Sequence, residues 1–173
     1  RPELLVTRKA AVAESQFTYA TGALVVWSRD ALPLTGTALE TLDAARISRL
    51  AMANPKLAPY GLAAQQTLDR LDLLKTLASR IVYGENIGQT FAMAASGNVT
   101  AALIAKSQLA SLPDDKRGHW IDVPDILHDP ILQDGVLTMR AKDNIVAQSF
   151  LIFMRSDRAA RIINRFGYGV SRP

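Results

Sequence analysis

The 173-residue sequence contains no cysteine, which excludes disulfides, thiolate metal sites and cysteine nucleophiles. It also lacks any uncharged apolar run of about 18 residues, the length that a membrane-spanning helix needs. Aromatic residues make up only 6% of the chain and charged residues 21%, and the net charge of +4 is spread thinly. Nucleic-acid-binding proteins usually gather their lysines and arginines on one face. The composition therefore indicates a globular protein with little electrostatic preference for nucleic acid.

Signatures of catalysis are missing as well. The sequence has no GxSxG, Walker A, GxGxxG or HExxH motif. Its two histidines, His119 and His128, fall in a predicted strand and a predicted loop, and a lone histidine is more often a surface residue than a metal ligand. We therefore expect neither an enzyme nor a cofactor nor a metal held directly by side chains. An enzyme of α/β fold is the weakest alternative.

What the sequence does contain is a regular alternation of strands and helices. From residue 47 to residue 123, short apolar runs alternate with segments whose apolar residues recur at helical spacing. This alternation predicts βαβ units around a mainly parallel sheet, in which ligands bind at the carboxyl ends of the strands. The predicted strands are 17–28, 47–53, 81–83, 101–105, 119–123 and 136–140, and the predicted helices are 3–14, a short one from 37, 60–74, 87–96, 107–112 and two near the C-terminus.

Two helix starts stand out, because each one follows a strand. The first is the segment Ala58-Pro59-Tyr60-Gly61, and the second runs from Gly84 to Gly88 with Asn86 at the capping position. A helix N-terminus carries partial positive charge and several unpaired N–H groups, so two that converge can hold an anion without lysine or arginine. The ordinary alternative remains open, since every α/β domain has helix N-termini and most of them bind nothing.

Four segments of the chain resemble those of periplasmic molybdate-binding proteins. They are residues 17–28 (FTYATGALVVWS), 51–64 (AMANPKLAPYGLAA), 82–90 (VYGENIGQT) and 150–168. The resemblance covers essentially the whole chain and implies the solute-binding component of an ABC importer, with an α/β fold of the two-lobed, type II periplasmic-binding-protein class. It also implies capture of molybdate, and usually of tungstate, in the periplasm, followed by delivery to the permease subunit in the membrane.

The same resemblance implies an oxyanion site built from neutral donors. Tyr60 corresponds to a position that donates a backbone N–H in some members and a tyrosine hydroxyl in others, and Ile87 to a position that donates its N–H. Gly61 and Asn86 complete the predicted ligand-binding set. Ala105 is a departure, because it stands where some members have a tyrosine ligand. We expect the amides of Tyr60 and Ile87 to point at one shared oxyanion.

The N-terminal segment departs most from the family pattern. Nothing in residues 1–16 resembles the units with serine or threonine ligands that begin these proteins. We therefore expect a chain that starts roughly a third of the way into the family fold. Its regions would be a partial first lobe with the crossing strand (1–27), a complete second lobe (28–125), and the return strand and C-terminal helices of the first lobe (126–173). Such a chain should bind molybdate weakly or not at all.

A partial lobe should expose strand edges and apolar helix faces. We therefore expect a second copy, a swapped element or a rearranged C-terminal region to cover them.

The main alternative in function is the effector-binding domain of a transcription regulator, which shares the two-lobed architecture. The preference between molybdate and tungstate and the identity of the permease are not encoded in any motif of this sequence.

Overall fold

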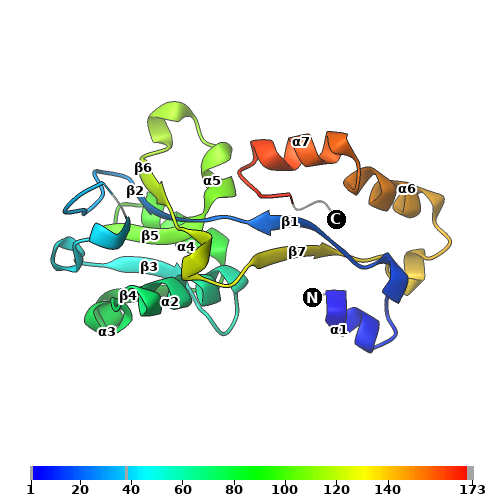
Figure 1. Cartoon of the computed structure of the whole chain (residues 1–173), viewed down its shortest axis with the longest axis horizontal. Helices are drawn as coiled ribbons and strands as arrows, with labels where there is room; N and C mark the ends of the chain where they lie inside the picture. The colour runs from blue at the N-terminus through cyan, green and yellow to red at the C-terminus, as the bar shows by residue number, and fades with distance from the viewer. Residues whose placement is uncertain (1, 38, 171–173) are drawn as a thin grey trace. The chain divides into compact units, whose positions relative to one another are not determined.

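The computed structural model describes residues 2–37 and 39–170, and their contacts divide the chain into two compact units. Unit 2 is the continuous segment Ala23–Ile131, and unit 1 combines the residues up to Gly22 with those from Leu132 onward. The chain therefore passes from one unit to the other twice, after Gly22 and after Ile131 (Figure 1). The lobe boundaries expected after residues 27 and 125 stay predictions.

Unit 2 contains a five-stranded sheet in the order β4-β3-β5-β2-β6. Strand β3 is parallel to both of its neighbours, β4 and β5, as the βαβ pattern predicts. Strand β2 instead runs antiparallel to β5 and β6, so the sheet is mixed. The strands are β2 Leu24–Ser28, β3 Leu50–Ala53, β4 Ile81–Gly84, β5 Ala101–Ala105 and β6 His119–Asp122.

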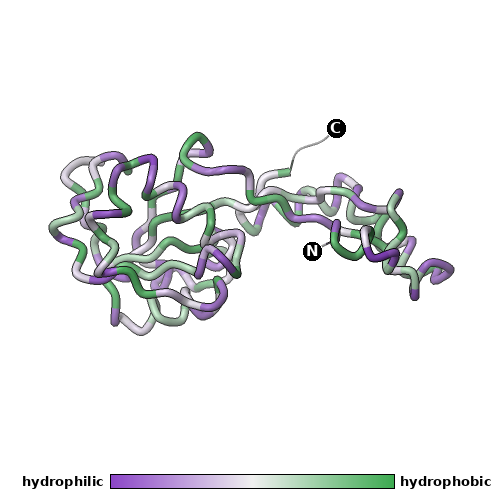
Figure 2. Tube along the Cα trace, turned by 90° about the horizontal axis from the view of Figure 1, so that it is seen from below, coloured by the Kyte–Doolittle hydropathy of each residue, from purple (hydrophilic) through white to green (hydrophobic). Residues whose placement is uncertain are grey.

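Both faces of strands β2, β3 and β5 are buried, and successive side chains of a strand point to opposite faces. Val26 of β2 belongs to a buried cluster with Leu68 of helix α2, whereas its neighbour Trp27 belongs to a second cluster with Ala94 of helix α4. Helices α2 and α4 therefore cover opposite faces. Along the chain, hydrophobic stretches alternate with hydrophilic ones (Figure 2). The helices of unit 2 are α2 Pro59–Arg70, α3 Leu74–Leu77, α4 Ile87–Ala95 and α5 Lys106–Ala110.

Some predicted elements are wrong at their ends. The helix predicted at 3–14 is shorter in the structure, where α1 spans Pro2–Thr7. Lys9, just beyond its end, has a left-handed φ of 56° that an α-helix does not accommodate. The predicted helix 60–74 is divided into α2 and α3, because Asp72 between them has a φ of 55° that no α-helix accommodates. The predicted strand 17–28 is also divided, at Ala23, into β1 (Phe17–Gly22) and β2.

The predicted strand 136–140 is wrong, and the strand lies earlier in the chain. Strand β7 spans Ile131–Gly135 and pairs with β1 in a two-stranded sheet of unit 1. The hydroxyl of Thr18 on β1 donates to the carboxylate of Asp134 on β7 at 2.6 Å, a cross-strand contact that fits this pairing. The apolar residues after β7 instead contribute Leu137, which is buried, and an isolated bridge between Thr138 and Ala11.

The remaining helices of unit 1 begin with side-chain caps. Helix α6 spans Ile145–Met154 and α7 spans Asp157–Arg165, and the side chains of Asn144 and Ser156 accept hydrogen bonds from amides in their first turns. No helix within residues 2–37 and 39–170 is long and apolar enough to cross a membrane. Short 3-10 helices complete the structure: η1 Ala13–Ser15, η2 Leu39–Thr41, η3 Ala44–Arg46, η4 Ala78–Arg80, η5 Asp114–Lys116, η6 Asp125–Leu127 and η7 Met139–Ala141.

Candidate functional site

The two helix starts singled out from the sequence follow neighbouring strands of one sheet. Strands β3 and β4 are parallel, with Ala53 opposite Gly84 at their carboxyl ends. Just beyond these ends, the amide of Asn54 donates to the carbonyl oxygen of Gly84 at 2.7 Å. The loops that lead into α2 and α4 therefore leave the sheet side by side, at the edge where parallel sheets bind ligands.

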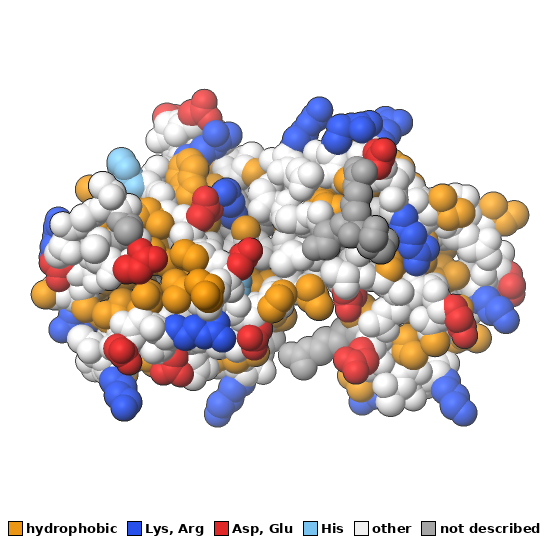
Figure 3. All heavy atoms as spheres, in the orientation of Figure 1, with side chains coloured by type: hydrophobic (Ala, Val, Ile, Leu, Met, Phe, Trp, Pro, Cys, Tyr) orange, Lys and Arg blue, Asp and Glu red, His pale blue; other side chains and the backbone are white. Residues whose placement is uncertain are grey.

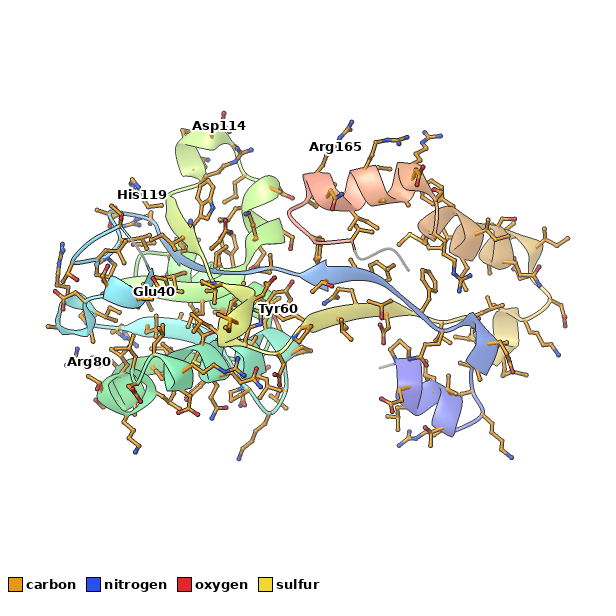
Figure 4. All side chains as sticks on the ribbon, viewed as in Figure 1. Glu40, Tyr60, Arg80, Asp114, His119 and Arg165 are labelled. Atoms are coloured by element: carbon orange, nitrogen blue, oxygen red, sulfur yellow. The ribbon has the colours of Figure 1, made fainter. Side chains whose placement is uncertain are left out.

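The start of α2 is organised by Asn54. Its side-chain oxygen accepts the amide of Lys56 at 3.0 Å, and its carbonyl oxygen accepts the amide of Ala58 at 3.0 Å. Ala58 is extended, and Pro59 opens the helix with its fixed φ and no N–H to satisfy. Tyr60 then lies in the first turn (Figure 4), where its side chain is buried and its hydroxyl is inaccessible to solvent.

Gly61 has a structural role that the sequence did not reveal. A Cβ at this position would collide with the backbone of Ala53 and Asn54. The amide of Gly61 donates to the carbonyl oxygen of Ala58 at 3.0 Å. The missing side chain thus lets the first turn of α2 pack directly against the end of β3. Gly61 therefore allows a close approach between two backbone segments of this chain. A direct contact of Gly61 with a ligand stays a prediction.

The start of α4 presents two amides that have no hydrogen-bond partner among the described residues. Asn86 is the N-cap, as the sequence predicts, and its side-chain oxygen accepts the amide of Gln89 at 2.9 Å. The Gln89 side chain accepts the amide of Glu85 at 2.6 Å, one residue earlier than in a standard capping box. The amides of Ile87 and Gly88 donate to no acceptor in the described part of the chain. They are the orphan donors from which an anion site can be built.

Gln108 supports this helix start, a role that the sequence did not reveal. Its side-chain nitrogen donates to the carbonyl oxygen of Ile87 at 3.1 Å, and its side-chain oxygen accepts the amide of Ala105 at 3.2 Å. One side chain therefore links the end of β5 with the first turn of α4. The available signal was the position of Gln108, three residues after a strand-ending residue, where a helix often carries a glutamine that turns back to the cap.

The groups at these helix starts that could bind a ligand are neutral hydrogen-bond donors. Glu85 and Lys56, the charged residues nearest in sequence, are both exposed. Among the described residues, no three or more histidines, cysteines or acids gather in a way that could hold a metal ion. An open hollow of about 530 Å³ adjoins the first turn of α2, but Tyr60, Gly61, Asn86 and Ile87 do not line it. Convergence of the Tyr60 and Ile87 amides on one point stays a prediction.

Comparisons with known proteins agree with the resemblance seen in the sequence. A family model described as bacterial extracellular solute-binding protein matches residues 1–169. The molybdate-binding protein ModA of Azotobacter vinelandii is 36% identical over 169 residues, covering 98% of this chain and 67% of the relative. ModA of Rhodobacter capsulatus is 36% identical over 170 residues, covering 97% and 65%. The chain thus spans about two thirds of the length of these curated relatives.

Solved structures confirm the predicted α/β fold of the periplasmic-binding-protein type. The periplasmic molybdate-binding protein of Azotobacter vinelandii matches with a TM-score of 0.86 and 31% identity, over 99% of this chain and 74% of that one. A substrate-binding protein of an ABC transporter from Agrobacterium tumefaciens matches with a TM-score of 0.68 at 12% identity, over 99% of this chain and 61% of that one. At that identity the second match concerns the fold alone.

Proposed function

Since this chain belongs to the family of bacterial extracellular solute-binding proteins, we propose that it binds molybdate for delivery to an ABC importer. The observation that carries the proposal is the pair of amides at Ile87 and Gly88, beside the start of α2, which have no acceptor within residues 2–37 and 39–170. We propose that these amides and the first turn of α2 at Tyr60 are the oxyanion site, with Asn86 and Gly61 shaping it. The family is one of solute-binding proteins and not of enzymes.

Neutral donors suit this ligand for a physical reason. A doubly negative oxyanion loses its hydration shell on binding, and this cost is tolerable only when each oxygen is hydrogen-bonded again. The N-terminus of α4 adds the favourable potential of the helix dipole. Because the donors see the same charge on molybdate and sulfate, we propose that the size of the site separates the two ions. Tungstate, which has the same charge and shape, would bind as well.

The affinity of this chain for molybdate should be lower than that of its longer relatives. The proposed donors all lie in unit 2, and a tetrahedral dianion needs donors on every side. The chain spans about two thirds of the curated relatives, so part of their structure has no counterpart here. We propose weak binding, a periplasmic location and an ABC permease as partner. The effector-binding domain of a transcription regulator gains no support from the relatives and is not proposed.

A substitution at Ile87 tests the site. Isothermal titration with molybdate, tungstate and sulfate would compare Ile87→Pro with Ile87→Ala. Ile87 is the first residue of α4 and Asn86 before it is extended (ψ 171°), so proline fits there while removing the N–H. Loss of one hydrogen bond to a charged group, about 1.5–3 kcal/mol, should weaken molybdate binding by about tenfold or more in the proline variant only.

The same experiment has a clear negative outcome. Equal molybdate affinities of Ile87→Pro and Ile87→Ala would exclude the Ile87 amide as a ligand. If titration heats are too small to fit, NMR chemical shifts of the Ile87 and Gly88 amides give the second readout. Molybdate that leaves both shifts unchanged at millimolar concentration would contradict the proposed function.

A further inference from the structure

Helix α7 carries three arginines on one face. Arg158, Arg161 and Arg165 follow one another at spacings of three and four residues, which places them within an arc of about 60° around the helix. All three are exposed, whereas Ala159 and Ala160 on the other side of the helix are buried. Arginine is almost never fully buried unless it is paired, so this is the face that meets solvent. We call the three residues the α7 arginine row.

The row concentrates positive charge at the surface of unit 1. Blue side chains gather along α7 (Figure 3), and the side chain of Arg165 points away from the helix (Figure 4). Three arginines against Asp157 alone give α7 a net charge of +2. This is half of the net charge of +4 of the whole chain, carried by nine of its 173 residues. Helix formation therefore brings together charges that are dispersed in the sequence.

No acidic side chain within the described residues pairs with the row. None of its arginines forms an ion pair or a side-chain hydrogen bond there, whereas Arg70 and Arg117 each pair with an aspartate. Arg155, just before α7, also differs, since its guanidinium lies 4.0 Å from the centre of the Phe17 ring and donates to the carbonyl oxygen of Ser15. A row of one sign thus remains available to a partner of opposite charge.

We infer that the α7 arginine row binds the surface of a bilayer that contains anionic phospholipid. A guanidinium group can donate two parallel hydrogen bonds to one phosphate, and phosphates cover such a surface. Each arginine near an anionic bilayer should raise the binding constant about fivefold, so three give a weak and reversible attachment. Because α7 buries its alanine face within the protein, the attachment is electrostatic and involves no insertion into lipid.

An acidic protein surface is the other partner with suitable charge. Exposed ion pairs between protein side chains contribute little unless their geometry is ideal, so carboxylates would have to match the intervals of the row. A bilayer imposes no such interval, because its headgroups are free to move to each arginine. The row is therefore better suited to lipid than to protein. The inference concerns unit 1 and is independent of the ligand proposed for unit 2.

Co-sedimentation with lipid vesicles tests the inference. The full chain would be mixed with vesicles of phosphatidylglycerol and phosphatidylcholine in equal parts, and separately with vesicles of phosphatidylcholine alone. We expect binding to the anionic vesicles only. It should be measurable at an ionic strength of about 0.01 M, where the Debye length is about 30 Å, and lost at about 1 M, where that length is about 3 Å.

Two triple variants of equal net charge distinguish the row from charge in general. The first combines Arg158→Gln, Arg161→Gln and Arg165→Gln, and its partition coefficient on anionic vesicles should fall about a hundredfold. The matched control changes three exposed residues of unit 2 and should lose less than about fivefold. It combines Arg49→Gln, Lys75→Gln and Lys116→Gln. Both variants remove three positive charges from the chain.

A third variant distinguishes lipid from an acidic protein. Replacement of the row by Arg158→Lys, Arg161→Lys and Arg165→Lys keeps the charge but removes the paired N–H groups of each guanidinium. An anionic bilayer attracts lysine and arginine alike, so this variant should keep its partition coefficient within about fivefold. Because all the substituted residues are exposed, far-UV circular dichroism should be unchanged in every variant.

Several outcomes would overturn the inference. These are equal binding to both kinds of vesicle, an equal loss in the two glutamine variants, a loss in the lysine variant as large as in the first glutamine variant, or tighter binding to poly-glutamate than to the anionic vesicles. None of these readouts uses molybdate, so failure here and failure of the proposed function can be told apart.

Discussion

The amide of Asn54 and the carbonyl oxygen of Gly84 are joined by a 2.7 Å hydrogen bond across the ends of β3 and β4. This backbone bond continues the parallel ladder by one residue and holds together the two loops that lead into α2 and α4. The candidate site depends on it, because a helix start can supply donors to a shared ligand only if its neighbour is fixed beside it.

Substitution by alanine should change the free energy of unfolding differently at two glycines near the site. Gly61→Ala places a Cβ against the carbonyl group of Ala53, and we expect the free energy of unfolding to fall by about 1–3 kcal/mol. In Gly88→Ala the nearest atom is the side-chain oxygen of Asn86 at 3.3 Å, so the change should stay within about 1 kcal/mol. Urea denaturation measures both. Equal stability of the two variants would contradict the close packing of α2 on β3.

Two substitutions of Asn86 should distinguish its effect on helix stability from its effect on anion binding. Asn86→Ala removes the acceptor for the Gln89 amide and should cost about 1 kcal/mol of stability. Asn86→Asp keeps a good cap, so its thermal denaturation should match that of the unsubstituted chain. The added negative charge beside the Ile87 amide should nevertheless weaken molybdate binding. An Asn86→Asp variant with unchanged molybdate affinity would place the anion elsewhere.

Gln108 should act as a positioning residue for α4. Gln108→Ala removes the hydrogen bonds to the Ile87 carbonyl and the Ala105 amide, and we expect a loss of about 1–3 kcal/mol of stability. Hydrogen exchange of the Ala105 amide should become faster, and molybdate binding weaker. Gln65→Ala is the control, because the Gln65 side chain has no hydrogen bond within the described residues. Identical exchange rates in both variants would argue against the bridge.

Tyr19 should make unit 1 sensitive to alkali. Burial raises the pKa of the Tyr19 phenol above its usual 10.0, and the charges of Tyr168 and Asp134 add to this. Because the folded pKa is raised, the unfolded chain ionises first; stability is complete below pH 10 and is lost as the pH rises through the folded pKa. Tyr19→Phe should reduce this loss in circular dichroism titrations above pH 10. Tyr83→Phe, at an exposed tyrosine of unit 2, should not.

Local chemistry explains which elements were predictable. The cap at Asn86 and the proline start of α2 each depend on residues within four positions of one another. Strand β7 was misplaced for the opposite reason. Residues 136–140 are as apolar as a strand, but pairing with β1, more than 100 residues earlier, selects Ile131–Gly135 instead.

The sequence by itself determined the family and the two helix starts, since these reside in short contiguous segments such as 51–64 and 82–90. The ligand residues named from the same segments stay predictions. Only the tertiary structure decided that β2 runs against its neighbours, that Gly61 fits against Ala53, and that Gln108 supports Ile87. Each of these joins positions far apart in the chain or depends on packing at the level of single atoms. Neither hydrophobic periodicity nor capping preference carries that information, because both report only on neighbours along the backbone.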